Sequence, residues 1–413
     1  MDNIARSRAR GSIALSTSSQ ALSTKILGTM ALAETKRIAH VHTAPVHSLA
    51  IDCIQSRYLL SAGADTSIQL FDLEAHKQTA QCLRQITPLS HVASGSGHTR
   101  SIANIEWYPV DTGIFSTSSF DNTLRIWDTN TMAEACQFDL ESRIHSHKLS
   151  PTGTHALIAA ANESAYIRLC DLRTASSTQQ LLAHQSGSTA LAWSPFQPYI
   201  LASGGSDGML KLWDIRQSDS CVSVFGYIPP VPSHKSSNKG ESPNRAHIGA
   251  VRSISFSTIS DRIISTGSDS RVRVWRTNVD RLPSLLLADF SANSVDTEGG
   301  SKAGHDNSHN KSWSTCTLEP SLTSILDGTA ESEIMFYPNN DKTIAVIEVM
   351  TGRHISTLHG HFAPVQCTAW RTKHMELYSS GADNDIFVWC PPAAENLTDE
   401  QIATRVDSWS DGN

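Results

Sequence analysis

A serine, a histidine and an aspartate recur at fixed spacing along the chain. In the best-defined copy, His184 precedes Ser203 by 19 residues and Asp207 follows Ser203 by four. These are the residue types of a nucleophilic catalytic triad, in which the histidine takes the proton of the serine hydroxyl. A triad is needed once per active site, whereas this set occurs in five places. We therefore interpret the set as structural and predict no catalytic residues.

A tryptophan completes most of these sets and explains their role. Trp213 lies six residues after Asp207, and a buried indole N–H needs a hydrogen-bond acceptor. A chain of hydrogen bonds from tryptophan through serine and histidine to aspartate would satisfy all four groups. The complete sets are His98–Thr117–Asp121–Trp127, His184–Ser203–Asp207–Trp213, His247–Ser265–Asp269–Trp275 and His361–Ser379–Asp383–Trp389, and a fifth, His42–Ser61–Asp65, has Phe71 in the tryptophan position.

The stretch SGGSDGMLKLWDIR, residues 203–216, predicts two strands joined by a tight turn. Glycine tolerates positive φ and aspartate bonds its own backbone, so the Gly-Ser-Asp-Gly segment favours a hairpin. Similar stretches begin at Ser61, Thr117, Ser265 and Ser379. Repeats of about 40 to 45 residues that end in Trp-Asp are typical of a β-propeller.

Two further repeats are degenerate. Counting 43 residues on from Trp127 places Cys170 in the tryptophan position of a third repeat, with Ser164 in place of the turn aspartate. A sixth repeat is inferred from TIAVIE, residues 343–348, with Ile347 in the tryptophan position. We predict an all-β, seven-bladed propeller over 34–391, in which blades one, three and six, with incomplete sets, are the less stable. A closed ring leaves no free edges, and segment 34–41 is expected to complete the last blade.

The ends and the long intervals have other compositions. Residues 1–33 predict a short helical arm, because Leu22, Ile26 and Met30 are spaced four apart and share one helix face with Leu27 beside them; a disordered tail is the alternative. The tail over 392–413 is acidic and expected to be flexible. The 217–245 and 280–310 intervals are rich in serine and are expected to be surface loops.

Composition and missing motifs exclude several functions. The net charge of −7 at pH 7 disfavours direct DNA binding, and no apolar run is long enough to span a membrane. The eight cysteines include no C-x-x-C pair, which argues against a zinc site. No P-loop, H-E-x-x-H or G-x-S-x-G occurs, so no cofactor or small-molecule substrate is expected. His145 and His147 have no evident partners and are interpreted as ordinary strand or loop residues.

Residues 107–130, WYPVDTGIFSTSSFDNTLRIWDTN, resemble the second repeat of the Cockayne syndrome group A family. Shorter stretches are similar to the same family, among them RYLLSAGAD, HSHKLSP, TIAVIEV and ELYSSGAD, and together they cover roughly residues 35–390. The resemblance implies a nuclear substrate receptor of a cullin-4 RING ubiquitin ligase, acting in transcription-coupled nucleotide excision repair. It implies three partners: the ligase's damage-binding adaptor, the Cockayne syndrome group B ATPase and the RNA polymerase II complex.

The resemblance also implies where the adaptor docks, because such receptors use a W-D-x-R box and an N-terminal helical arm. The box matches Trp213, Asp214 and Arg216, and in altered form Asp171 and Arg173 after Cys170. An arginine fork suits this place, since it can bind a carboxylate or carbonyl groups at two points. The alternative is that Arg216 and Arg173 are ordinary solvated arginines. The arm would contribute Leu22, Ile26, Leu27 and Met30.

Two other classes of function stay open at this point. One is another WD-repeat scaffold, in chromatin or RNA processing, and the specific run at 107–130 argues against it. The other is an enzyme that uses the central channel. The absence of a non-repeating cluster of titratable residues argues against that class.

Overall fold

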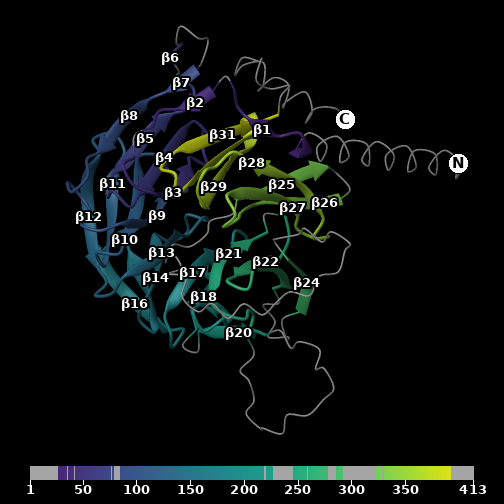
Figure 1. Ribbon diagram of the computed structural model, residues 1–413. Coiled ribbons are helices and arrows are strands. Elements are labelled where there is room, and N and C mark those ends of the chain that lie inside the picture. Colours follow the sequence, from purple (N-terminus) through teal and green to yellow (C-terminus); the bar gives the residue numbers. More distant parts are fainter. Residues whose placement is uncertain are drawn as a thin grey trace, which may run out of the picture.

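The computed structural model describes residues 27–34, 36–40, 42–75, 77–78, 84–217, 220–226, 245–257, 259–277, 285–291, 321–327 and 330–391. They form seven four-stranded sheets that stand around a common axis as the blades of a propeller (Figure 1). The predicted all-β, seven-bladed fold is confirmed. The predicted arm residues Leu22 and Ile26, the tail over 392–413 and most of the 217–245 and 280–310 intervals lie outside the described residues.

Each blade has four strands, and the first strand of each lies nearest the centre of the ring. Blade one is β3 Val46–Ile51, β4 Tyr58–Gly63, β5 Ile68–Asp72 and β8 Pro88–Val92. Blade two is β9 Ile102–Trp107, β10 Ile114–Ser119, β11 Thr123–Asp128 and β12 Ala133–Asp139. Blade three is β13 Ile144–Leu149, β14 Leu157–Asn162, β15 Tyr166–Asp171 and β16 Ser176–Leu182. Blade four is β17 Ser188–Trp193, β18 Ile200–Gly205, β19 Leu210–Asp214 and β20 Cys221–Phe225.

The ring continues in the same order. Blade five is β21 Val251–Phe256, β22 Arg262–Gly267, β23 Arg271–Arg276 and β24 Leu285–Ser291. Blade six is β25 Ser321–Asp327, β26 Ala330–Pro338, β27 Thr343–Glu348 and β28 His354–His359. Blade seven is β29 Val365–Arg371, β30 Glu376–Gly381, β31 Ile386–Cys390 and β1 Ala31–Leu32. The strands predicted for the two degenerate repeats, YIRLCD and TIAVIE, are β15 and β27.

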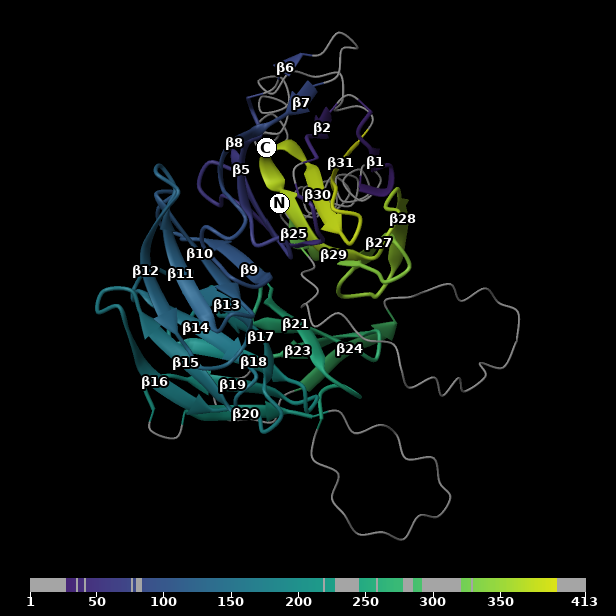
Figure 2. The ribbon, with the colours of Figure 1, turned by 60° about the vertical axis from the view of Figure 1, so that its left-hand side comes forward.

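Neighbouring blades bury the two faces of each sheet. One core cluster joins Leu60 and Leu70 of blade one to Ile105, Phe115 and Trp127 of blade two. Burial on both faces explains why middle strands such as β18 are fully buried and read as continuous runs of apolar or small residues. The first strands of successive blades contact one another and line the centre of the ring (Figure 2).

The ring is closed by a strand from the N-terminal side, but not by the segment expected to supply it. Strand β1 pairs with β31 of blade seven, with Ala31 opposite Cys390 and Leu32 opposite Trp389. The expected segment 34–41 instead contains β2 (Lys36–Ile38), which pairs in parallel with β7 (Arg84–Ile86) in a small sheet with β6 (Lys77–Gln78). The cause is packing, because Ile38 is buried in the core between blades seven and one.

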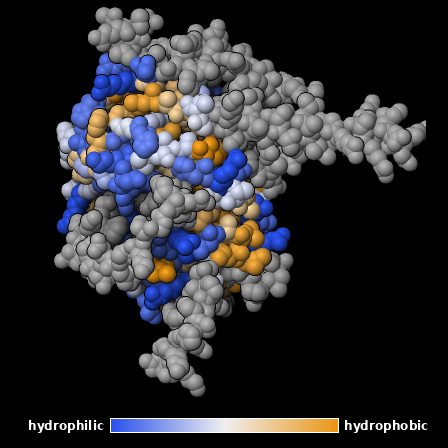
Figure 3. Space-filling model, turned by 45° about the vertical axis from the view of Figure 1, so that its right-hand side comes forward, coloured by the Kyte–Doolittle hydropathy of each residue, from blue (hydrophilic) through white to orange (hydrophobic). Residues whose placement is uncertain are grey.

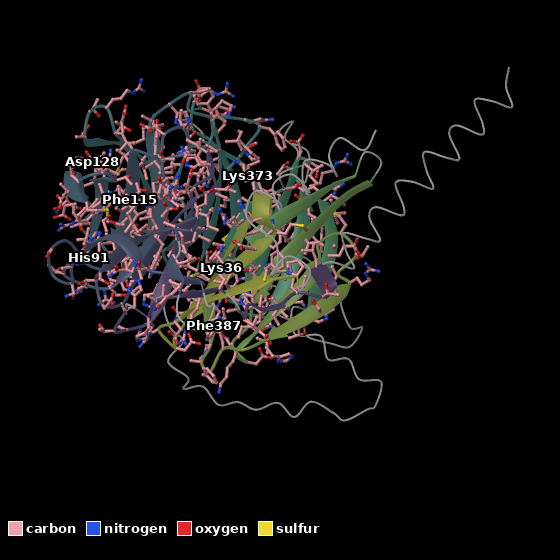
Figure 4. The ribbon with its side chains drawn as sticks, turned by 90° about the horizontal axis from the view of Figure 1, so that it is seen from above. Lys36, His91, Phe115, Asp128, Lys373 and Phe387 are labelled. Carbon is pink, nitrogen blue, oxygen red and sulfur yellow. The ribbon has the colours of Figure 1, made fainter. Side chains whose placement is uncertain are left out.

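A buried ionic cluster fastens the seam between the last and first blades. Lys36 Nζ donates to both Glu376 carboxylate oxygens at 2.8 and 3.0 Å. The same carboxylate accepts from Arg371 Nη1 at 3.1 Å and from the Tyr378 hydroxyl at 2.6 Å. Arg371 Nε donates to Ser56 O of blade one at 2.6 Å. Burial raises the pKa of Glu376, but the charges of Lys36 and Arg371 outweigh it and bring the pKa to about 2. Figure 4 labels Lys36 beside the last blade.

Where the structure describes the chain, it contains no helix that is long and apolar enough to cross a bilayer.

We expect Lys36→Met to destabilise the fold. The substitution keeps the apolar stem of the side chain but removes a positive charge that stabilises the buried Glu376 carboxylate. The free energy of unfolding should fall by about 3 kcal/mol, the range seen when a buried ion pair loses one partner. Urea unfolding followed by tryptophan fluorescence measures it. Arg37→Met, at the exposed position of the same strand, is the matched control and should change stability by less than about 0.5 kcal/mol. Equal losses in both variants would contradict the role given to Lys36.

Candidate functional site

The four complete Ser/Thr–His–Asp–Trp sets form the same hydrogen-bond chain in their blades. In blade four, Trp213 Nε1 donates to Ser203 Oγ at 2.8 Å, and Ser203 Oγ lies 2.8 Å from His184 Nε2. His184 Nδ1 lies 3.1 Å from Asp207 Oδ1. The corresponding tryptophan-to-hydroxyl distances are 2.8 Å at Trp127, 2.9 Å at Trp275 and 2.7 Å at Trp389. Ser203 is fully buried and its oxygen accepts from the indole, so it is not placed to attack a substrate.

In blades one, two, four and five, the aspartate that binds the histidine is held in its charged form. Burial raises the pKa of Asp65, but the hydrogen bonds and charge of His42 outweigh it and bring the pKa to about 2. The histidines of blades two, four and five lower the pKa of their aspartates in the same way, at Asp121, Asp207 and Asp269. In blades one, two, five and seven the carboxylate also accepts from the backbone N–H that follows the histidine, as Asp65 does from Thr43. Each set therefore ties its turn to the loop that enters the blade.

Blade three lacks such a set, and instead a buried histidine connects it to blade two through hydrogen bonds. His147 is fully buried, with Nε2 at 2.7 Å from Ser116 Oγ and Nδ1 at 2.8 Å from Ser118 Oγ, both on β10 of blade two. The interpretation that His147 lacks partners is wrong. The fourth residue of the first strand is apolar in blades one, two, four and five, at Leu49, Ile105, Leu191 and Ile254. His147 thus replaces an apolar contact between blades by a polar one.

His145 is half-buried and lies edge-on to the Phe120 ring, with a centroid distance of 5.9 Å. Its Nδ1 is buried without a hydrogen-bond partner among the described residues.

Arg216 is exposed but fixed in place. Its Nε and Nη2 donate to the two carboxylate oxygens of Asp214 at 3.0 and 2.8 Å. Its guanidinium lies 4.9 Å from the centroid of the Tyr199 ring. The Arg216 side chain is 60% exposed, whereas that of Asp214 is 4% exposed. The hydrogen bond from Arg216 lowers the pKa of Asp214, so the pair keeps both charges while the remaining N–H groups of the fork face solvent.

The aromatic support of Arg216 is shared between two blades. His155, in the loop between β13 and β14 of blade three, stacks on Tyr199 with a centroid distance of 5.5 Å. His155 Nε2 lies 2.6 Å from Pro198 O in the corresponding loop of blade four. Because both neighbours are anchored, Arg216 presents a preorganised donor group, unlike an ordinary solvated arginine.

Other members of the predicted docking set differ from Arg216. Arg173 is 68% exposed and contacts Asp171 through one 3.5 Å approach of its Nε. Trp213 is 3% exposed and belongs to the core cluster of blades three and four. Asp214 therefore positions Arg216, and of Trp213, Asp214 and Arg216 only the arginine is exposed.

Leu27 and Met30, the two arm residues that the structure describes, are buried against the propeller. Leu27 and Met30 are 2% and 7% exposed and pack with Phe336, Leu358 and Trp389 in the core between blades six and seven. The propeller itself covers the apolar face that the spacing indicated, and the docking role of Leu27 and Met30 stays a prediction.

Sequence reasoning did not identify three exposed apolar residues that lie at the same end of the ring as Arg216. Ile54 is 45% exposed, Val110 56% and Phe196 49%, each in the loop between the first and second strands of its blade. Loop residues follow no periodic pattern, so the sequence holds no signal that predicts which of them are exposed. On the face shown in Figure 3, apolar side chains gather in separate patches among hydrophilic ones.

No group of His, Cys, Asp and Glu side chains within the described ranges could hold a metal ion.

Comparison with known proteins matches this architecture. The WD domain, G-beta repeat family matches residues 89–128, 175–214, 242–276 and 352–390, and these four segments are WD40 repeats. It is 27% identical over 450 residues to WD repeat-containing protein ATCSA-1 of Arabidopsis thaliana, covering 92% of this chain and 93% of that protein. It is 30% identical to Radiation-sensitive protein 28 of Saccharomyces cerevisiae, over 48% of this chain and 42% of the relative. Ribosome biogenesis protein ytm1 of Pyrenophora tritici-repentis is 26% identical, over 57% of this chain and 56% of that protein.

The buried His147 predicts a measurable pH dependence of stability. Burial lowers the pKa of His147 to about 3, from an ordinary value of 6.5. Below about pH 6.5 the imidazole binds a proton in the unfolded chain but not in the folded chain. The contribution of His147 to the free energy of unfolding is therefore complete above pH 6.5 and falls by about 1.4 kcal/mol per pH unit towards pH 3. His147→Asn should flatten the fall in unfolding free energy between pH 6 and 4, measured in urea. Ser118→Ala, which keeps the imidazole, should retain the wild-type slope; an unchanged slope in His147→Asn would contradict this role of the histidine.

Proposed function

We propose that this WD40-repeat protein is the substrate-recognition subunit of a nuclear cullin-4 RING ubiquitin ligase in transcription-coupled nucleotide excision repair. The observation that carries the proposal is Arg216, an exposed arginine held by Asp214 and Tyr199 at the end of β19. The resemblance of residues 107–130 to the Cockayne syndrome group A family supports it. Similarity to ATCSA-1 over 92% of the chain supports it as well, as does similarity to a radiation-sensitive protein of yeast.

The mechanism would be proximity, with no covalent step on this chain. The loops between first and second strands and those between third and fourth strands lie at one end of the ring, and the remaining turns lie at the other. The end that carries Arg216 would bind the damage-binding adaptor. The opposite end would be free to engage the Cockayne syndrome group B ATPase and the RNA polymerase II complex. A rigid receptor that holds ligase and substrate together raises their effective concentration.

A second candidate is a WD-repeat scaffold in RNA processing. The similarity to ribosome biogenesis protein ytm1 favours it, although that match covers 57% of the chain against 92% for ATCSA-1. Co-purification from cells separates the two candidates. The ligase proposal expects the damage-binding adaptor among the recovered proteins, whereas preribosomal particles without the adaptor would favour the second candidate.

We expect Arg216→Glu to weaken adaptor binding by at least tenfold, because a charge reversal would repel the acceptors that the fork binds. Arg173→Glu should have a smaller effect, since Arg173 is less firmly held, and the double variant should abolish binding. Biolayer interferometry with purified adaptor measures the affinity, and circular dichroism checks the fold. Arg353→Glu, 60% exposed at the same end of blade six, is the control. Wild-type affinity in the double variant would overturn the docking assignment.

The pathway is tested separately in cells. Deletion of the gene should slow removal of ultraviolet lesions from the transcribed strand of active genes and leave the non-transcribed strand unaffected. Equal repair of the transcribed strand with and without the protein would contradict the proposed pathway.

A further inference from the structure

We infer that the docking surface extends from Arg216 in blade four to a second arginine, Arg57 in blade one, across a continuous arc of loops. This inference rests on the proposed function, because it commits the surface to the same adaptor. It adds a residue that no W-D-x-R box marks, since Arg57 precedes the second strand of its blade.

Arg57 is built into the surface in the same way as Arg216. Its Nε and Nη2 donate to the two oxygens of Asp72 at 3.0 and 2.6 Å, and its guanidinium lies 5.3 Å from the centroid of the Tyr58 ring. The side chain is 39% exposed, whereas that of Asp72 is 8% exposed. Asp72 and Asp214 occupy the same place, as the last residue of the third strand of their blades. In both cases a buried carboxylate and an aromatic ring fix an exposed guanidinium.

The two arginines lie at the same end of the ring. Arg57 belongs to the loop between β3 and β4, and Arg216 to the loop between β19 and β20. In a four-stranded antiparallel meander, the connection between the first two strands and that between the last two emerge at the same edge. Blades two and three lie between blade one, which carries Arg57, and blade four, which carries Arg216. Figure 2 shows this order of the blades, and a partner that binds both arginines must cross blades two and three.

The loops between the arginines touch one another in sequence. We call the loops 52–57, 108–113, 150–156 and 194–199, between the first and second strands of blades one to four, the loop arc. Cys53 Sγ donates to Pro109 O at 3.5 Å. Gly153 packs so closely on Val110 that a Cβ there would lie 2.9 Å from its Cγ2. His155 then contacts Pro198, as described above. The arc is therefore one connected surface.

The chemistry of the loop arc indicates what it binds. Its exposed apolar side chains, Ile54, Val110 and Phe196, lie between the two arginines. The charge of Arg216 is balanced by Asp214, and that of Arg57 by Asp72 and by Glu74, whose Oε2 lies 3.5 Å from Arg57 Nε. Interfaces with an apolar centre and a few arginine anchors are typical of specific protein partners. The matching partner surface would be apolar in its middle, with carboxylate or backbone carbonyl acceptors at both ends. Nucleic acid does not fit, because phosphates bind clusters of cations that have no partner of their own, whereas each arginine here is paired with an aspartate and the exposed side chains between them are apolar.

Blade six offers a matched contrast at the same end of the ring. Arg353 is 60% exposed and approaches Glu348 at one 3.5 Å contact, and it lies outside the loop arc. A general electrostatic effect of arginine on binding would therefore appear in Arg353 as well as in Arg57.

Purified full-length chain and purified adaptor test the inference by biolayer interferometry. Arg57→Gln should weaken binding by at least fivefold, and Arg353→Gln by less than twofold. Ile54→Asn leaves the Arg57–Asp72 pair in place and should also weaken binding by at least fivefold, so the test holds even if Arg57→Gln perturbs blade one. Circular dichroism and thermal unfolding confirm that each variant is folded.

The outcomes separate the two levels of proposal. If the wild-type chain does not bind the adaptor, the proposed function fails and the inference fails with it. If the wild type binds and Arg216→Glu weakens binding, while Arg57→Gln and Ile54→Asn bind as the wild type does, the proposed function stands and the extension to blade one is wrong. Equal losses in Arg57→Gln and Arg353→Gln would also overturn it, because they would indicate a general charge effect.

Discussion

The hydrogen bond from a buried tryptophan N–H to a serine or threonine hydroxyl is the interaction on which each regular blade depends. It places the third strand against the second, and the histidine and aspartate carry the connection on to the turn and the entering loop. Because neighbouring sheets cover both faces of a blade, none of these polar groups can turn to water. The same burial that forms the core therefore makes the hydrogen-bond chain obligatory, and the chain connects the turn and the entering loop at one end of the blade.

The ring tolerates incomplete blades because other contacts replace what they lack. Blade three has no tryptophan set, and His147 bonds it to two serines of blade two. The last blade takes only a two-residue strand from the N-terminal side, and the buried Lys36–Glu376–Arg371 cluster fastens that seam. Inner-strand tryptophans add links between blades, as Trp107 Nε1 does to Ala50 O at 3.0 Å. A closed ring can thus keep its shape while individual repeats diverge.

The spacing of the Ser203 set and its copies predicted the number of blades and their hydrogen-bond chains, because those contacts lie within one repeat and recur at a fixed interval. Contacts between blades leave no such interval, which is why the partners of His147 were missed. The four-residue spacing that ends at Met30 indicated an apolar face but not what covers it, and the cover is the propeller's own core. Sequence reasoning missed Arg57 for a related reason, since the carboxylate it binds lies 15 residues away and the arginine itself belongs to no repeat motif.

One end of the ring combines fixed arginines with exposed apolar loops, and the central claim is that this end binds the ligase adaptor. Hydrogen–deuterium exchange of the full chain, with and without purified adaptor, tests that claim most directly. We predict slower exchange on complex formation in the loops that join the first and second strands of blades one to four, and in the loop carrying Arg216. Protection confined to the turns between second and third strands, at the opposite end of the ring, would contradict it.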